Sequence, residues 1–361
     1  MASRRGIAFR SRVASRRGAA SRREAASRRG VAFRGGTAPG EGSLLRRRIR
    51  VLLAVLVTAA VVVPLTAAAR PAIPAPAPAA LAPVTAATLD RTYAANRANA
   101  ELASRMAAAH GDAHRAAADR AVAAPSRRLL SYDGRGAGRL AEIFGDLAHA
   151  DRVAVLVPGS DTSLDTYERF HEAAAALHRR LTGQAPAGTS TAVVAWLGYT
   201  TPGTVSSTVL TTDRADEAAP ALREFIRGLH ALTGPDTHVS LLCHSYGSVV
   251  CGRAAAGLDV DDLVLLGSPG TGADSVTALR TRARVWAARG ADDWVAEVPH
   301  ASVDLFGTTV GFGTDPVAPS FGARVFTAGD AGHSDYFRPG SASLANLTRI
   351  VLGETTEVTH A

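Results

Sequence analysis

One serine stands where an apolar strand pattern gives way to a helix pattern. Residues 239–250 read VSLLCHSYGSVV, so Ser245 is predicted at the tip of the turn between the two. Such a turn pushes the serine Oγ into the cleft and needs small residues two places before and after it. Gly247 is the small residue two places after Ser245. Cys243, two places before it, meets the requirement only by its small volume. The pattern predicts a nucleophile, with a helix-capping serine as the alternative; His244 is expected to pack under the turn.

A nucleophilic serine needs a base, and beyond such a turn the acid and then the histidine follow along the chain. Three histidines come after Ser245: His300, His333 and His360. His360 is penultimate and expected to fray, and His300 lies too close to the expected acid for another strand to intervene. His333, in a glycine-rich loop, is therefore the predicted base; a surface loop histidine without a role is the alternative.

The acid is expected after the apolar run 284–288, where two adjacent carboxylates occur. Asp293 is favoured over Asp292 because it stands three residues after Gly290. Asp292 remains the alternative acid, and the member of the pair that is not used would be solvated or cap the next turn. An acid in this role holds the histidine tautomer and stabilises the imidazolium, so it must be partly buried.

Two backbone N–H groups are predicted to form the oxyanion hole. One belongs to Tyr246, directly after the nucleophile, and the other to Ser160, in the loop after the apolar run 153–157. Gly159 lets the second group approach a substrate closely. An ordinary strand-to-helix connection, capped by Ser163 or Asp165, is compatible with the same residues.

From residue 127 onward, short Val/Leu runs alternate with Ala-rich amphipathic stretches. This alternation predicts an α/β domain with a mostly parallel sheet covered by helices on both faces, with ligands at the carboxyl ends of the strands. The expected strands are 128–131, 152–157, 191–196, 238–243, 262–266, 284–288 and 323–327, and the expected helices are 165–181, 217–232, 246–256 and 274–279.

Four short motifs stand in order within this region: VPG at 157–159, CHSYGS at 243–248, GSPG at 267–270 and GHSDY at 332–336. Together they resemble the actinobacterial α/β-hydrolase family of unknown function, over roughly residues 128–340. The resemblance implies an α/β-hydrolase fold and a Ser-Asp-His triad, and it supplies no substrate. Cys243 replaces the first glycine of the family's turn.

The positive charge of the chain is confined to its start. Residues 1–50 hold fifteen arginines against Glu24 and Glu41, whereas the other 25 arginines face 30 acidic residues. Residues 1–45 are therefore predicted to be a disordered basic tail. This tail is either merely solvated or binds anionic lipid or nucleic acid; no nucleic-acid partner is expected for the mildly acidic remainder.

An uncharged run of nineteen residues, 51–69, follows four arginines and contains Pro64. It is just long enough to cross a bilayer of ~30 Å at ~1.5 Å per residue. Residues 46–69 are predicted to be a signal peptide if cleaved, or a membrane anchor through 51–69 if not, with the arginines inside. Both place the catalytic domain outside the cytoplasm; a buried core helix is the alternative.

The remaining segments are expected to be a Pro/Ala linker at 70–84, a helical segment at 85–126 broken near Gly111, and the catalytic domain at 127–355. Cys243 and Cys251 lie across a strand-turn-helix unit and are predicted to be two buried thiols. The histidines lack ligand spacing and no phosphate-binding glycine loop occurs, so no metal and no cofactor is predicted.

The sequence thus predicts an exported serine hydrolase that cleaves an ester or thioester through an acyl-enzyme on Ser245. A small-molecule or lipid-like acyl substrate is expected, with Tyr199 to Asp213 as a short lid. Two alternatives stay open: an amidase or peptidase with the same triad, and a membrane-tethered non-catalytic binding protein on a hydrolase fold. The oligomeric state is not predicted.

Overall fold

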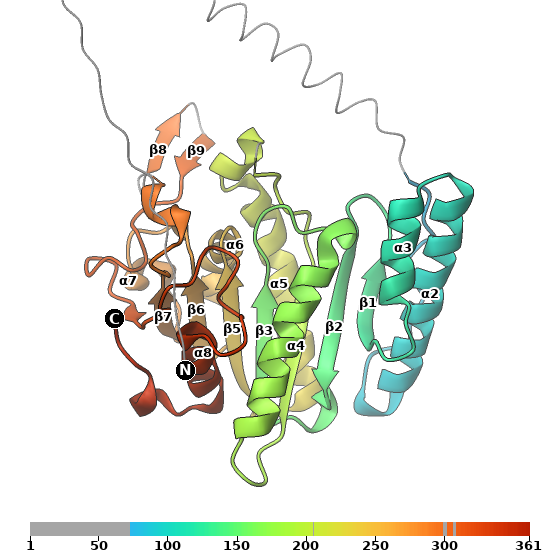
Figure 1. Ribbon diagram of the computed structural model, residues 1–361, viewed down its shortest axis with the longest axis horizontal. Helices are drawn as coiled ribbons and strands as arrows, with labels where there is room; N and C mark the ends of the chain where they lie inside the picture. Colours follow the sequence, from blue (N-terminus) through green and yellow to red (C-terminus); the bar gives the residue numbers. More distant parts are fainter. Residues whose placement is uncertain (1–72, 205, 299–301, 306–307) are drawn as a thin grey trace, which may run out of the picture. The chain divides into compact units, whose positions relative to one another are not determined.

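The computed structural model describes residues 73–361, except 205, 299–301 and 306–307 (Figure 1). The expected basic tail, the expected signal or anchor segment and His300 therefore lie outside the described residues. No helix in the described part of the chain has both the length and the apolarity needed to cross a bilayer. The described residues form one compact unit.

An eight-stranded sheet organises this unit, in the order β1-β2-β4-β3-β5-β6-β7-β10. Its strands are β1 (Leu129–Asp133), β2 (Arg139–Gly145), β3 (Arg152–Val157), β4 (Thr191–Leu197), β5 (His238–His244), β6 (Asp262–Leu266), β7 (Arg284–Ala288) and β10 (Arg324–Val325). β2 is antiparallel to both of its neighbours, and the other pairs are parallel. The prediction of a mostly parallel sheet is confirmed.

Helices cover both faces of the sheet. Val155 of β3 lies in the core shared with α5 and α6, and the next residue, Leu156, lies in the core shared with α4 and α8 (Figure 1). Because both faces are buried, the inner strands are continuously apolar. These helices are α4 (Tyr167–Gln184), α5 (Asp213–Thr233), α6 (Gly247–Ala254) and α8 (Ala342–Leu352). A short α7 (Val276–Leu279) precedes β7.

The helical segment ahead of the domain consists of α2 (Leu89–Ala109) and α3 (Ala113–Val122), with the break at the predicted Gly111. α2 packs along β1 at one edge of the sheet (Figure 1). Arg115 of α3 is buried, pairs with Asp119 at 3.1 Å and donates a hydrogen bond to the carbonyl of Gly136 at 3.0 Å. The two helices therefore close the edge that β1 would otherwise expose.

Several elements escaped the sequence prediction. β2, α8 and the hairpin of β8 (Ser302–Leu305) and β9 (Thr308–Gly311) were not expected, and the strand expected at 323–327 shortens to β10. The sequence pattern did not indicate β2, because Glu142 interrupts its apolar run. That buried carboxylate forms an ion pair with Arg127, with Nε at 2.7 Å, and accepts a hydrogen bond from the Tyr167 hydroxyl at 2.9 Å. Both partners come from outside β2.

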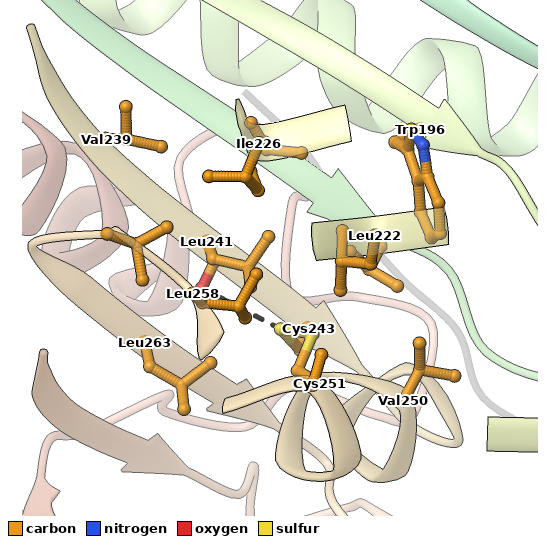
Figure 2. Packing of buried hydrophobic residues seen from close by; sticks show 14 of the residues in the cluster. Trp196, Leu222, Ile226, Val239, Leu241, Cys243, Val250, Cys251, Leu258 and Leu263 are labelled. Carbon is orange, nitrogen blue, oxygen red and sulfur yellow. Dashed lines mark hydrogen bonds between the residues drawn. A yellow bond between two sulfur atoms is a disulfide. The ribbon is translucent and has the colours of Figure 1, made fainter. Parts of the chain in front are cut away.

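The cysteine prediction was wrong, because Cys243 and Cys251 form a disulfide. The strand-to-helix turn is so sharp that α6 folds back on β5 and brings the two Cα atoms to 6.5 Å, within the bridging range. Both residues are fully buried, among apolar side chains that include Leu241, Leu222 and Val250 (Figure 2).

Candidate active site

Ser245 sits on the turn between β5 and α6 with a φ of 53°. This left-handed conformation is costly for a residue with a Cβ, and it presents the side chain to the cleft. The Ser245 N–H donates to the carbonyl of Leu266 at 2.9 Å, which fixes the turn to β6. At Gly247 a Cβ would lie 2.6 Å from the carbonyl oxygen of Val157, so only glycine fits.

The three predicted triad residues lie in one hydrogen-bonded row. The Ser245 hydroxyl faces His333 Nε2 at 2.9 Å, and His333 Nδ1 faces Asp293 Oδ1 at 2.9 Å. The serine follows β5, the aspartate follows β7 and the histidine follows β10. All three therefore come from the carboxyl ends of parallel strands, where such sheets bind ligands.

Asp293 is 2% exposed and accepts further hydrogen bonds from the Val295 N–H at 2.9 Å and the Tyr336 hydroxyl at 2.5 Å. Burial by itself raises the pKa of this carboxyl, but the hydrogen bonds from His333, Tyr336 and Val295 outweigh it and hold the pKa below its ordinary value. The carboxylate is thus ionised at neutral pH. Asp292 is exposed, and its side chain accepts no hydrogen bond from the described residues.

Tyr336 is a site residue to which the sequence prediction gave no role. Its hydroxyl donates to Asp293 and accepts the Gly290 N–H at 3.1 Å. Burial, followed by the contact with Asp293, raises the pKa of Tyr336, so it stays a donor. A Cβ at Gly267 would lie 2.5 Å from Asp293 Oδ2. The GSPG and GHSDY motifs thus each supply one residue that shapes the carboxylate pocket.

Two further rings contact the imidazole of His333. The rings of His244 and Trp294 each lie with centroids 4.7 Å from it. His244 Nε2–H donates to the carbonyl of His333 at 2.6 Å, which fixes the backbone of the histidine loop. Burial, followed by the nearby His333, lowers the pKa of His244 to about 4. His244 is therefore neutral, and its contacts are those of a positioning residue rather than a base.

Replacing His244 by glutamine should weaken the pH dependence of stability. An unfolded histidine takes up a proton near pH 6.5, whereas folded His244 does so only near pH 4. Between these values the unfolded chain binds more protons, so the free energy of unfolding falls as the pH drops from 6.5 to 4. Urea unfolding at pH 4.5 to 7 should show a shallower fall in H244Q than in wild type, and equal slopes would contradict the assignment.

The two residues predicted to supply the oxyanion donors, Ser160 and Tyr246, line the same pocket as Ser245. The backbone N–H groups of Ser160 and Tyr246 have no acceptor among the described residues. At Gly159 a Cβ would lie 2.6 Å from the Ser245 Cβ, so the glycine lets this loop approach the nucleophile. The Tyr199 hydroxyl donates to the carbonyl of Pro158 at 2.6 Å and holds the loop in place.

The alternative given for this loop, an ordinary capped connection, is also present in it. Ser163 caps a short 3-10 helix at Leu164–Thr166. The cap and the free N–H of Ser160 thus coexist in neighbouring residues.

His360, which was expected to fray, is held in place: its backbone pairs with Phe326, and its Nδ1 hydrogen-bonds to the carbonyl of Val325 at 3.2 Å. It lies outside the pocket lining.

A pocket of about 740 Å³ opens over Ser245 and His333. From the segment expected to be a lid, Thr204, Val209 and Leu210 border it. Within the described ranges, no three His, Cys, Asp or Glu side chains are grouped so that they could hold a metal ion. The arrangement places a serine hydroxyl, an imidazole with an ionised partner and two backbone N–H groups without a described acceptor beside one cavity.

The model of a family described as alpha/beta hydrolase matches residues 133–303. With the strand order and the strand-to-helix turn at Ser245, this match decides the fold. The chain is an α/β-hydrolase-fold protein. The segment that the family model covers includes the turn at Ser245 and Asp293, and His333 follows it in the chain.

Relatives of this chain occur in mycobacteria and are uncharacterized proteins. One from Mycobacterium tuberculosis is 30% identical over an alignment of 256 residues that covers 62% of this chain and 39% of the relative. One from Mycobacterium bovis is 34% identical over 168 residues, covering 44% of this chain and 63% of the relative. The chain thus spans less than two thirds of each relative. These matches agree with the predicted actinobacterial family of unknown function.

Among solved structures, a serine hydrolase without a lid from Xanthomonas campestris is 17% identical, with a TM-score of 0.39, over 64% of this chain and 94% of that one. A dienelactone hydrolase from Anabaena variabilis is 15% identical, with a TM-score of 0.36, over 62% of this chain and 93% of that one.

Proposed function

We propose that this α/β-hydrolase is a serine hydrolase that cleaves carboxylic esters through an acyl-enzyme on Ser245. The observation that carries the proposal is the continuous row of hydrogen bonds from Ser245 through His333 to Asp293, at the floor of an open pocket. A neutral serine hydroxyl is a weak nucleophile, and it is activated when an oriented base accepts its proton. The row supplies such a base.

In the first half-reaction, Ser245 Oγ attacks the ester carbonyl carbon while its proton moves to His333 Nε2. The ionised Asp293 stabilises the imidazolium that forms. The carbonyl oxygen becomes an oxyanion, which accepts hydrogen bonds from the N–H groups of Ser160 and Tyr246 in this scheme. Cleavage of the C–O bond then releases the alcohol, which takes the proton from His333 and leaves the acyl group on the serine.

In the second half-reaction, a water molecule gives a proton to His333 Nε2 and attacks the acyl carbon. The second tetrahedral intermediate breaks the bond to Ser245 Oγ, the proton returns to that oxygen, and the carboxylic acid leaves. The same base and the same two donors serve both steps. His244 and Tyr336 take no proton in this scheme, because they hold the histidine loop and the Asp293 carboxylate.

Covalent labelling by a fluorophosphonate probe tests the nucleophile. The full chain should be labelled. Ser245→Ala should lose labelling, because it lacks the serine oxygen that the probe phosphonylates. Ser334→Ala is the matched control, since Ser334 lines the same pocket beside His333 and should keep labelling. Unlabelled wild type would refute the serine mechanism, and labelled S245A would place the nucleophile elsewhere.

Turnover of matched 4-nitrophenyl esters and 4-nitroanilides tests the reaction class. Ester cleavage that is far faster than anilide cleavage, and that is lost in S245A, is the expected result. Comparable or faster anilide cleavage would make the protein an amidase or peptidase with the same residues. Labelling without turnover of either set of substrates would support a reactive Ser245 and contradict the proposed ester activity.

We further propose that the domain acts outside the cytoplasm. The arginines followed by an uncharged run at 51–69 support export, and so does the Cys243–Cys251 disulfide, since disulfides persist in oxidising compartments. Sequencing the N-terminus of the protein recovered from cell fractions tests this. A start near residue 70 in the medium indicates cleavage, full-length protein in the membrane indicates an anchor, and recovery only from the cytosol refutes export.

A further inference from the structure

Apolar side chains from both hydrophobic cores line the pocket over Ser245. Phe170 and Phe337 pack against the core beneath α4 and α8, whereas Val209 and Phe312 pack with the core beneath α5 and α6. All four line the pocket, as does Leu210, which is 55% exposed at its rim. An ester bound at Ser245 therefore meets apolar surface along both of its arms, the acyl arm and the alcohol arm.

Three polar residues of the pocket lining, Asp161, Thr166 and Thr204, are hydrogen-bonded to one another. The Asp161 carboxylate accepts the N–H of Thr204 at 3.1 Å and also its hydroxyl. The hydroxyl of Thr166 donates to the carbonyl of Asp161 at 2.8 Å. These groups have satisfied hydrogen bonds and would lose them by turning toward a polar substrate. They offer little recognition of a sugar or a peptide backbone.

Arg169 differs from these groups. It lies in the first turns of α4, one residue before Phe170, and lines the pocket. Its side chain is exposed and makes no ion pair and no hydrogen bond with the described residues. Asp161 and Arg169 are the charged side chains of the lining other than its two histidines, and only Asp161 has a partner. The pocket therefore holds one available cation next to an apolar wall.

We infer that the substrate is an amphiphilic ester, apolar on both sides of its carbonyl, with an anionic group on the arm that runs along α4 to Arg169. A guanidinium presents several N–H donors and suits carboxylate and phosphate groups alike. The inference rests on the proposed ester hydrolysis, for it assigns the substrate class of that same site.

Matched chromogenic esters test the inference with the full chain. 4-Nitrophenyl octanoate is compared with its ω-carboxylated analogue, which carries the charge on the acyl arm, and with 3-carboxy-4-nitrophenyl octanoate, which carries it on the alcohol arm. In Arg169→Gln, kcat/KM should fall about fivefold for one of the two anionic esters, the size expected of an exposed ion pair. The change should lie in KM, and the neutral ester should keep its wild-type kcat/KM.

Arg179→Gln is the control, because Arg179 is an exposed arginine of the same helix that does not line the pocket. It should leave all three esters unchanged. The Arg169 effect should shrink in 0.5 M NaCl, since salt screens exposed charges, and a purely structural loss would not. Equal responses of R169Q and R179Q, or a preference for an ω-ammonium ester over the carboxylated one, would overturn the inference.

Binding to the catalytically silent Ser245→Ala protein separates this inference from the proposed function. By calorimetry, octyl phosphate should bind about fivefold more weakly when Arg169→Gln is added, and octanol should bind equally to both proteins. If no ester is hydrolysed but this difference appears, the ester activity fails and the anion site stands. If esters are hydrolysed and octyl phosphate binds both proteins equally, the anion site fails alone.

Discussion

Replacing Asp293 by asparagine should lower kcat about 10⁴-fold with little change in KM, the size of effect that a triad carboxylate has. An amide in this place donates to His333 Nδ1 instead of accepting from it, so the imidazole carries its proton on Nε2 and cannot take one from Ser245. The stabilisation of the imidazolium is lost as well. Steady-state kinetics on a 4-nitrophenyl ester measure the change.

Asp292→Asn is the matched control for this prediction. Asp292 is the neighbouring acid, and it is exposed, so its amide should turn over esters at close to the wild-type rate. A larger loss in D292N than in D293N would make Asp292 the acid. Equal and small losses in both variants would mean that His333 works without an aspartate.

Removing the disulfide should cost the protein about 2.5 kcal/mol of unfolding free energy. The bond between Cys243 and Cys251 closes a short loop around Ser245, and the entropy that a cross-link removes from the unfolded chain gives a value of this order. Urea unfolding of Cys243→Ala/Cys251→Ala against wild type, without reductant, measures it.

The single variants provide the control for this effect. Cys243→Ala and Cys251→Ala each break the same bond, so each alone should lose most of the stability that the double variant loses. Wild-type protein unfolded without reductant should expose no reactive thiol. Two titratable thiols in that sample, or single variants as stable as wild type, would contradict the bridge.

The positions of the candidate triad residues along the chain could be predicted from the sequence, because they depend on local patterns. Ser245 was identifiable from an apolar strand, a tight turn and a helix within twelve residues, all set by nearby sterics. β3, β6 and β7 have the predicted bounds, because strands buried on both faces are continuously apolar. His333 and Asp293 were predicted by their position after such strands, and the structure brings both to the serine.

Features that depend on contacts between distant segments were decided only by the tertiary structure. β2 went unrecognised because a buried carboxylate, Glu142, is tolerable only when its partners arrive from elsewhere in the chain. The same holds for Tyr336, whose hydroxyl matters only once its loop lies over Asp293. Proximity in space, rather than residue type, likewise decided between thiols and a disulfide at Cys243 and Cys251. Local patterns along the chain thus identify the groups of the candidate site, whereas the packing of the sheet brings in the groups that orient them.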